Sequence, residues 1–285
     1  MKVLAATDGS KYGRWAIEWL ARMPFKSQPV VRVLHVVDVA GLRAPFMVQP
    51  MIAGTERYLQ TEINRMEAAA KAAKAQAAEL LTALGLVGTV TVDRGGVGAT
   101  IMRHAKRGVG LLSIGSRGLD ALDRFMLGSI SNHAIHHASC SVLVVKEQPR
   151  PIRQVLLAID GSPASNRALR FVVRHFDPAH DGPKREPVTV TLVHVMPYLK
   201  YPELREAGKA VMRHSVEKLS KAGFQVREVM RLGKPADEIL TLAGKPRADV
   251  IVTGAKGLGA IGRVLLGSVS TRVVQHAASS VLVVR

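Results

Sequence analysis

The chain has 285 residues, and its 40 lysines and arginines against 22 aspartates and glutamates give a formal net charge of +18. Hydrophobic residues make up 47% and charged residues 22%, a balance typical of a globular protein that excludes extensive disorder. The single cysteine, Cys140, excludes an intramolecular disulfide and a four-cysteine zinc site. Because no signal-peptide core or membrane-length apolar run is present, we expect a soluble, cytoplasmic protein of two domains.

The positive charge is spread evenly along the chain. Residues 1–150 carry 19 basic and 11 acidic side chains, and residues 151–285 carry 21 and 11. No basic run marks a nucleic-acid-binding arm, and aromatic residues, at 4%, form no stacking platform. The sequence therefore predicts a solvated basic surface, with no specific nucleic-acid partner and no membrane partner.

Short β-branched runs alternate with helical stretches throughout. In the first half, strands are predicted at 2–7, 30–37, 89–93, 110–114 and 141–146, and helices at 11–22, 56–84, 97–107 and 129–138. In the second half, strands are predicted at 153–159, 187–195, 225–230, 249–253 and 280–284, with helices between them. This alternation indicates right-handed β-α-β crossovers and a parallel sheet covered on both faces. The predicted fold is two tandem, doubly wound α/β domains, each with a five-stranded parallel sheet.

The two halves are copies of one another. Residues 115–145 match residues 254–284 at 16 of 31 positions without a gap, and the run ending at Asp8 repeats in the run ending at Asp160. Pro149-Arg150-Pro151 is the natural joint, because proline interrupts both helices and ladders. The predicted domains are residues 1–148 and 152–285.

Both halves carry the spacing Gly-x2-Gly-x9-Gly-Ser after the fourth strand. It starts at Gly115 and Gly254, includes a cation at Arg117 and Lys256, and ends where a helix begins. Glycines let the main chain approach a ligand, and a helix N-terminus favours an anion, so the pattern fits a phosphate chain. A carboxylate after the first strand could accept from a ribose hydroxyl or hold Mg²⁺ through water. The alternative is that the glycines only form turns and Ser129 and Ser268 only cap helices.

Other signals in the sequence are weaker. The run from Gly257 to Gly262 fits G-x-G-x-x-G by chance, because the first half has aspartates there, and the P-loop lysine position holds Gly267. His133 and His137 have the spacing of a metal pair but no local acidic ligand, so we predict no metal site. His35 and His194 suit packing as well as chemistry. The sequence offers no defensible catalytic residue.

Taken together, the strand ending Thr-Asp-Gly-Ser, the Leu-His-Val-Val strand, the glycine spacing and the closing Ser-Val-Leu-Val-Val resemble the universal stress protein family in its tandem, ATP-binding form. The resemblance covers nearly the whole chain. It implies ATP, with Mg²⁺ as an option, as the cofactor. It also implies a role in stress response or regulation, with at most weak ATP hydrolysis or autophosphorylation.

The resemblance implies a cofactor-binding set in each half. In the first half the set is Ala6, Asp8, Val36, Gly115, Arg117, Gly118, Gly128, Ser129, Ile130 and Ser131. In the second half it is Ala158, Asp160, Val195, Gly254, Lys256, Gly257, Gly267, Ser268, Val269 and Ser270. The family's last strand commonly pairs across a two-fold axis, so we expect the two halves to pair through residues 141–145 and 280–284, with a homodimer as a further option.

Two departures from the family pattern argue against equal affinity of the two sites. The fourth strand of the second half begins Ala248-Asp249, whereas the first half has Val109-Gly110 there. The loop around residues 43–55 is longer and more apolar than its second-half counterpart. Three functions stay open: a nucleotide-controlled binding module, a slow ATPase that uses Asp8 or Asp160 with Ser129 or Ser268, and a scaffold that binds no nucleotide.

Overall fold

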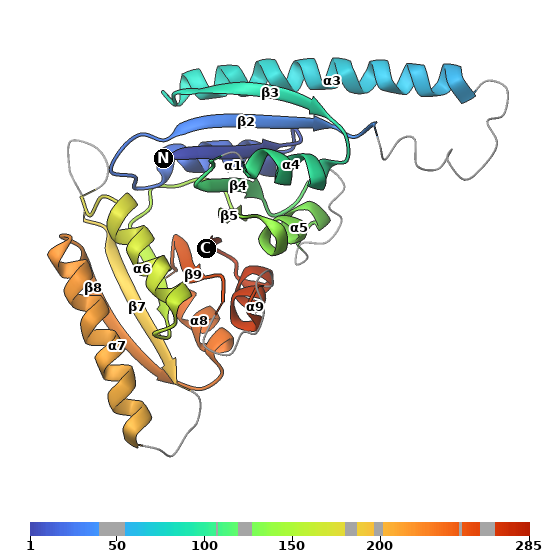
Figure 1. Ribbon diagram of the computed structural model, residues 1–285. Helices are drawn as coiled ribbons and strands as arrows, with labels where there is room; N and C mark the ends of the chain where they lie inside the picture. Colours follow the sequence, from blue (N-terminus) through green and yellow to red (C-terminus); the bar gives the residue numbers. More distant parts are fainter. Residues whose placement is uncertain are drawn as a thin grey trace.

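The computed structural model describes residues 1–39, 55–106, 108–118, 127–179, 187–196, 202–244, 247–256 and 266–285. Ten strands form a single sheet in the order β3-β2-β1-β4-β5-β10-β9-β6-β7-β8 (Figure 1). All neighbouring pairs are parallel except β5 and β10 at the centre, which run antiparallel. Of the described helices, none is long and apolar enough to cross a membrane.

The described residues of the first half form five parallel strands and four helices. These are β1 (Lys2–Thr7), α1 (Lys11–Arg22), β2 (Val30–Val37), α3 (Thr55–Ala83), β3 (Gly88–Arg94), α4 (Val97–Ala105), β4 (Leu111–Gly115), α5 (Ser129–His137) and β5 (Ser141–Val145). The second half repeats the order with β6 (Gln154–Ile159), α6 (Pro163–His175), β7 (Thr189–Met196), α7 (Pro202–Lys221), β8 (Gln225–Leu232), α8 (Pro235–Ala243), β9 (Val250–Gly254), α9 (Ser268–His276) and β10 (Ser280–Val284). The doubly wound α/β fold class is confirmed, and the element boundaries agree with the predicted ones to within about two residues.

Local signals begin the first helix of each half in the same way. The Ser10 hydroxyl accepts from Gly13 N at 3.2 Å, and the Ser162 hydroxyl accepts from Ser165 N at 3.1 Å. Each serine thereby satisfies one of the main-chain donors that a helix N-terminus leaves unpaired. Pro163 then occupies the first turn of α6, where its missing N–H costs nothing.

The core is two apolar layers, one on each face of the sheet. Alternate residues of β1 separate into them, with Val3 and Ala5 facing one layer and Leu4 and Ala6 the other. The first layer holds side chains of α1, α3, α6 and α7, and the second those of α4, α5, α8 and α9. Each layer contains residues of both halves, so the halves share the core on each face of the sheet.

Strands β5 and β10 join the halves at the centre of the sheet. Leu143 lies opposite Leu282, and the strands are buried along their whole lengths. Beyond each strand, Lys146 N donates to the Ser280 hydroxyl at 3.1 Å and Arg285 N to the Ser141 hydroxyl at 3.4 Å. An all-apolar run suits a strand covered on both faces, and the antiparallel pairing leaves neither strand as an exposed edge.

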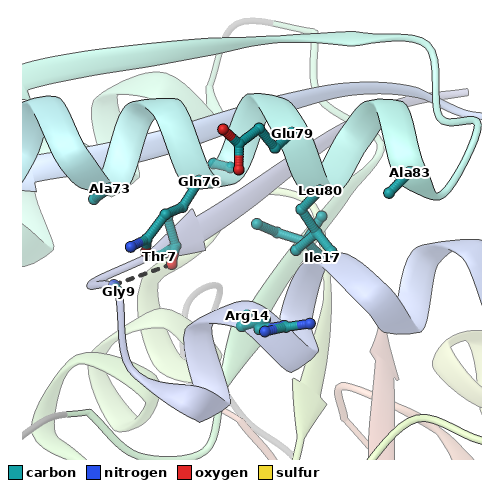
Figure 2. Close-up of a pocket in the computed structure, with 10 residues that line it drawn as sticks. Thr7, Gly9, Arg14, Ile17, Ala73, Gln76, Glu79, Leu80 and Ala83 are labelled. Atoms are coloured by element: carbon teal, nitrogen blue, oxygen red, sulfur yellow. Dashed lines mark hydrogen bonds between the residues drawn. The ribbon is translucent and has the colours of Figure 1, made fainter.

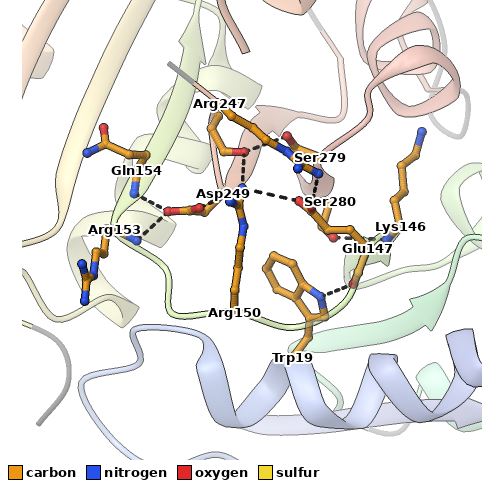
Figure 3. A network of polar contacts seen from close by, with 11 residues as sticks. Trp19, Lys146, Glu147, Arg150, Arg153, Gln154, Arg247, Asp249, Ser279 and Ser280 are labelled. Atoms are coloured by element: carbon orange, nitrogen blue, oxygen red, sulfur yellow. Dashed lines mark hydrogen bonds and ion pairs between the residues drawn. The ribbon is translucent and has the colours of Figure 1, made fainter. Parts of the chain in front are cut away.

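The connection between the halves is anchored by Asp249 (Figure 3). Its buried carboxylate accepts from Arg153 N at 2.8 Å and Gln154 N at 2.7 Å, and it pairs with Arg150 at 2.9 Å. The corresponding residue of the first half, Gly110, has no side chain to accept hydrogen bonds; it lies beside Met1, and its N–H donates to Lys2 O at 2.9 Å. This explains the departure between the two fourth strands, because the carboxylate serves the connection and not a ligand site.

Candidate functional site

A cavity of about 100 Å³ opens at the carboxyl ends of the second-half strands. Its walls come from the ends of β6, β7 and β9 and from the first turns of α6, α8 and α9. The lining residues are Ala158, Ile159, Asp160, Ser165, Val193, Val195, Pro235, Ile239, Thr253, Gly254, Lys256, Val269 and Ser270. This volume is about a third of the smallest typical ligand pocket, so the cavity is too small for a whole drug-sized ligand.

Seven predicted residues meet in this cavity: Ala158, Asp160, Val195, Gly254, Lys256, Val269 and Ser270. Gly267 and Ser268 lie beside it at the start of α9, and Gly257 falls outside the described residues. Pro235 and Ile239, which were not predicted, add an apolar wall from α8. Gly233-Lys234-Pro235 marks in the sequence where α8 begins after β8, but not that this helix packs against the cavity.

The turn after the first strand is built identically in both halves. Asp8 Oδ1 accepts from Ser10 N, and Asp160 Oδ1 accepts from Ser162 N, both at 2.9 Å. Gly9 and Gly161 have φ values of 83° and 80°, a conformation that side-chain-bearing residues rarely adopt. The turn therefore fixes one carboxylate oxygen on the main chain and orients each carboxylate at the edge of the sheet.

The glycine loops are closed by main-chain hydrogen bonds. Gly128 N donates to Ser116 O at 2.8 Å, and Gly267 N donates to Ala255 O at 2.7 Å. Both glycines are the N-caps of their helices, and neither cap makes a side-chain hydrogen bond within the described part of the chain. The interpretation of Ser129 and Ser268 as N-caps is therefore wrong, because each is the first helical residue.

The second serine of each motif holds the loop. The Ser131 hydroxyl donates to Gly115 O at 2.5 Å, and the Ser270 hydroxyl donates to Gly254 O at 2.6 Å. A hydroxyl has one hydrogen, so these side chains use their donor on the main chain. What they offer a ligand is a main-chain N–H or an acceptor oxygen, which changes the predicted role of hydroxyl donors.

The first-half cation is placed differently from its second-half counterpart. Arg117 Nη1 donates to the Tyr12 hydroxyl at 2.8 Å, and the guanidinium carbon lies 5.4 Å from the ring centroid. Tyr12 packs edge-on to Trp15, with ring centroids 5.0 Å apart. At the position of Tyr12, the second half has Ala164. The two sites therefore share their main-chain framework and differ in how the cation is held.

The remaining first-half residues occupy equivalent positions. Ala6 lies within β1, Val36 near the end of β2, and Ile130 in the first turn of α5. Asp8 lies close to Gly118, because a methyl group on Gly118 would be 2.7 Å from Asp8 Oδ2. The structure thus brings the first-half set to the corresponding edge of the sheet.

A second cavity of about 300 Å³ lies between α1 and α3, on the face of the sheet opposite α4 and α5 (Figure 2). Its floor is apolar, with Ile17 and Leu80, and its rim includes Arg14 and Glu79. Arg14 is already paired with Glu18 at 2.7 Å. None of the predicted cofactor-binding residues lines this cavity.

His35 and His194 make equivalent main-chain contacts in the two halves. His35 Nδ1 is 3.1 Å from Thr7 O and His194 Nδ1 is 2.9 Å from Ile159 O, so each ring bridges to the neighbouring strand. The rings of His133 and His137 lie 4.5 Å apart on α5. Within the described residues, no three histidine, cysteine or acidic side chains come together as a metal site.

The fold is that of the doubly wound α/β proteins, a class whose ligand sites generally lie at the carboxyl ends of the strands. The model of the universal stress protein family matches residues 1–146 and again residues 151–285, and the chain belongs to this family. A universal stress protein of Mycolicibacterium smegmatis is 29% identical over 300 residues, covering 99% of this chain and 96% of the relative. One from Mycobacterium tuberculosis is 28% identical over 312 residues, covering 99% and 94%.

The fold has a solved counterpart of the same length. A universal stress protein from Archaeoglobus fulgidus superimposes with a TM-score of 0.71 at 22% identity, covering all of this chain and 98% of that one. At this identity the likeness concerns the fold. The family sequence match and the structural match therefore agree over the whole chain.

Proposed function

We propose that this universal stress protein binds ATP at the carboxyl edge of each half and acts as a regulatory factor in stress response. In this proposal residues 1–148 and 152–285 are two domains, and nucleotide occupancy changes their conformation or the partner they bind. The observation that carries it is the second-half cavity, where residues predicted from the glycine motif meet at one opening.

The cavity chemistry suits one end of an adenine nucleotide. Ala158, Val195 and Ile239 provide an apolar surface for a base, and Asp160 provides an acceptor at the end of β6 for ribose hydroxyls. Lys256 and the uncapped N-terminus of α9 favour the phosphates on the other side. Asp160 also fits Mg²⁺, since this ion needs only one or two protein carboxylates when phosphates and waters complete its shell.

The first test is to denature freshly purified protein and to identify the released small molecules by ion-pair chromatography and mass spectrometry. About two adenine nucleotides per chain support two sites, and about one per chain supports unequal halves. Release of none, followed by no thermal shift with added ATP and Mg²⁺, would overturn the proposal. A bound ligand at 100 times its Kd should stabilise the fold by about 2.7 kcal/mol.

The second test removes the two glycine N-caps. The double variant Gly128→Val and Gly267→Val places branched side chains where the phosphates should approach, and we expect it to lose ATP binding with unchanged far-UV circular dichroism. Ala75→Val, on the exposed side of α3, is a control that adds two carbons away from both sites. Retained affinity in the double variant would place the phosphate site elsewhere.

A further inference from the structure

Two basic side chains reach from one half to the other at the ends of the central strands. Lys146 follows β5, and its Nζ donates to Ala277 O at 2.7 Å and Gln275 O at 3.2 Å, at the C-terminal end of α9. Arg285 follows β10, and its Nη2 donates to Ile135 O at 2.5 Å, near the C-terminal end of α5. Each half therefore supplies the cation that binds the last carbonyls of the other half's glycine-motif helix.

The same strand ends also hold the glycine loops of their own halves. Val145 O accepts from Ser116 N at 2.7 Å, and Val284 O accepts from Ala255 N at 2.8 Å. Residues 145 and 146 thus contact the first-half loop through the main chain and α9 of the second half through the lysine side chain. This is a continuous physical connection between the two candidate sites.

A cation at the C-terminus of a helix stabilises it, because the last carbonyls carry partial negative charge. Helix α9 has nine residues, so the carbonyls that Lys146 binds are only about two and a half turns from the N-terminus beside the second cavity. Holding this short helix in place favours the N–H groups that face a phosphate.

The charge of Lys146 is sensitive to the first site. Burial and then the positive charge of Arg117 lower the pKa of Lys146 to about 8. On the side of the first half, Arg117 is held against Tyr12 in the glycine loop. On the side of the second half, His276 is the basic residue in the last turn of α9. An anion bound beside Arg117 offsets the repulsion and keeps the lysine charged.

We propose that Lys146 couples the two sites: an anionic ligand at the first-half glycine loop keeps its ammonium group charged on the C-terminus of α9, and the second site then binds more tightly. This inference rests on the proposed function, because both sites are taken to bind the phosphates of ATP.

The experiment is a calorimetric titration of the full-length chain with ATP and Mg²⁺ at pH 7 and pH 9. Gly128→Val removes the first site, and the affinity of the second site is compared with and without this substitution. At pH 9 about a tenth of a lysine with a pKa near 8 is charged, so we expect Gly128→Val to weaken the second site about fivefold. At pH 7 most of the lysine is charged in either case, and the expected change is less than about twofold.

Lys146→Arg is the decisive variant, because its guanidinium stays charged at both pH values. In this background we expect Gly128→Val to leave the second-site affinity unchanged at pH 7 and pH 9. Lys146→Met should weaken the second site at both pH values and also abolish the coupling; circular dichroism checks that each variant folds. If Lys146→Met does not fold, Lys146→Arg alone carries the test.

The outcomes separate the two proposals. Absence of ATP binding to the wild-type chain overturns the proposed function, and the coupling with it. ATP binding with a second site that ignores Gly128→Val at pH 9 overturns the coupling alone. A fivefold loss that persists in the Lys146→Arg background shows that the sites communicate by another route and also overturns it.

Discussion

The carboxylate of Asp93 accepts a hydrogen bond from His104 Nε2 at 2.8 Å, which ties the end of β3 to α4. Arg103 donates to the same carboxylate oxygen at 2.9 Å, and Arg94 N donates to the other at 2.8 Å. These hydrogen bonds, that of His104 first, lower the pKa of Asp93 from 3.8 to about 2. The second half has Arg231 and Leu242 at the positions of Asp93 and His104, so the first half carries a local network of its own.

This network predicts an acid-sensitive contribution to stability. Since the pKa of Asp93 is lower in the folded state, the contribution is complete above about pH 4 and is lost as the pH falls toward 2. Asp93→Asn should lower the free energy of unfolding by about 1 kcal/mol at pH 6. This value is reduced for solvent screening, because a third of the Asp93 side chain is exposed. Urea unfolding at pH 6, 4 and 3 measures it, and a wild-type-to-variant difference that stays constant with pH contradicts the prediction.

Gly115 is expected to be a packing residue. A methyl group at this position would lie 2.8 Å from both the carbonyl carbon and the oxygen of Tyr12, where only a shift of the main chain could relieve it. Gly115→Ala should therefore destabilise the fold by about 1–3 kcal/mol, as overpacking does. Urea unfolding measures this cost. Substitutions that disturb no contact usually change the free energy of unfolding by less than about 0.5 kcal/mol, so a change below this value would show that the main chain shifts without cost.

Gly118→Ala is its counterpart in the same loop. Here the methyl group would meet Asp8 Oδ2 at 2.7 Å, a side-chain atom that can rotate away. We expect little change in stability and a weaker affinity for ATP, because the Asp8 carboxylate is displaced from the site. The pair of variants separates the two roles of glycine in one motif. Equal affinities of Gly118→Ala and the wild type for ATP would show that Asp8 is not part of the binding site.

The fold was predictable because each element has a local cause. The β-branched runs and the serine caps at Ser10 and Ser162 depend on residues adjacent in sequence, and the repeat states the pattern twice. The glycine motif was predictable for the same reason. The contribution of Pro235 and Ile239 was missed because it arises from packing across the sheet, and the hold of Tyr12 on Arg117 joins residues 105 positions apart.

The anchoring role of Asp249 also required the structure. Its partners, Arg153 N and Gln154 N, are 96 and 95 residues away in sequence. The sequence showed only that the first half lacks the aspartate. What it could not show is that this aspartate holds the connection between the halves through Arg150, Arg153 N and Gln154 N.

Removing this anchor should be costly. Asp249→Ala removes the buried acceptor of two main-chain donors and one partner of Arg150, and we expect a loss of about 2–4 kcal/mol in the free energy of unfolding. Asp237→Ala is the matched control, because Asp237 pairs with Arg272 at 2.9 Å with 41% of its side chain exposed. The control should lose less than about 1 kcal/mol. Equal losses in the two variants would show that Asp249 does not anchor the connection.

The cavity between α1 and α3 has a counterpart that is filled. A methyl group on Gly161 would lie 2.9 Å from Cγ2 of Val211 on α7, whereas on Gly9 it would meet no described atom within 4 Å. Counting back from Gly85 and Gly223, which both follow their helices, places Ala73 at the position of Val211. From this we infer that the smaller side chain of Ala73 on α3 leaves the space open in the first half.

Ala73→Val should fill part of this space and stabilise the protein. Two added carbons contribute about 1.6 kcal/mol when buried, and the lower helix propensity of valine costs about 0.5 kcal/mol, so we expect a net gain of about 1 kcal/mol. Ala75→Val, on the exposed side of the same helix, has the propensity cost without the burial and should lose stability. Urea unfolding of the two variants measures the difference. A loss of stability in both variants would contradict the prediction. It would mean that the cavity is too open to bury the added methyl groups and that its volume does not depend on residue 73.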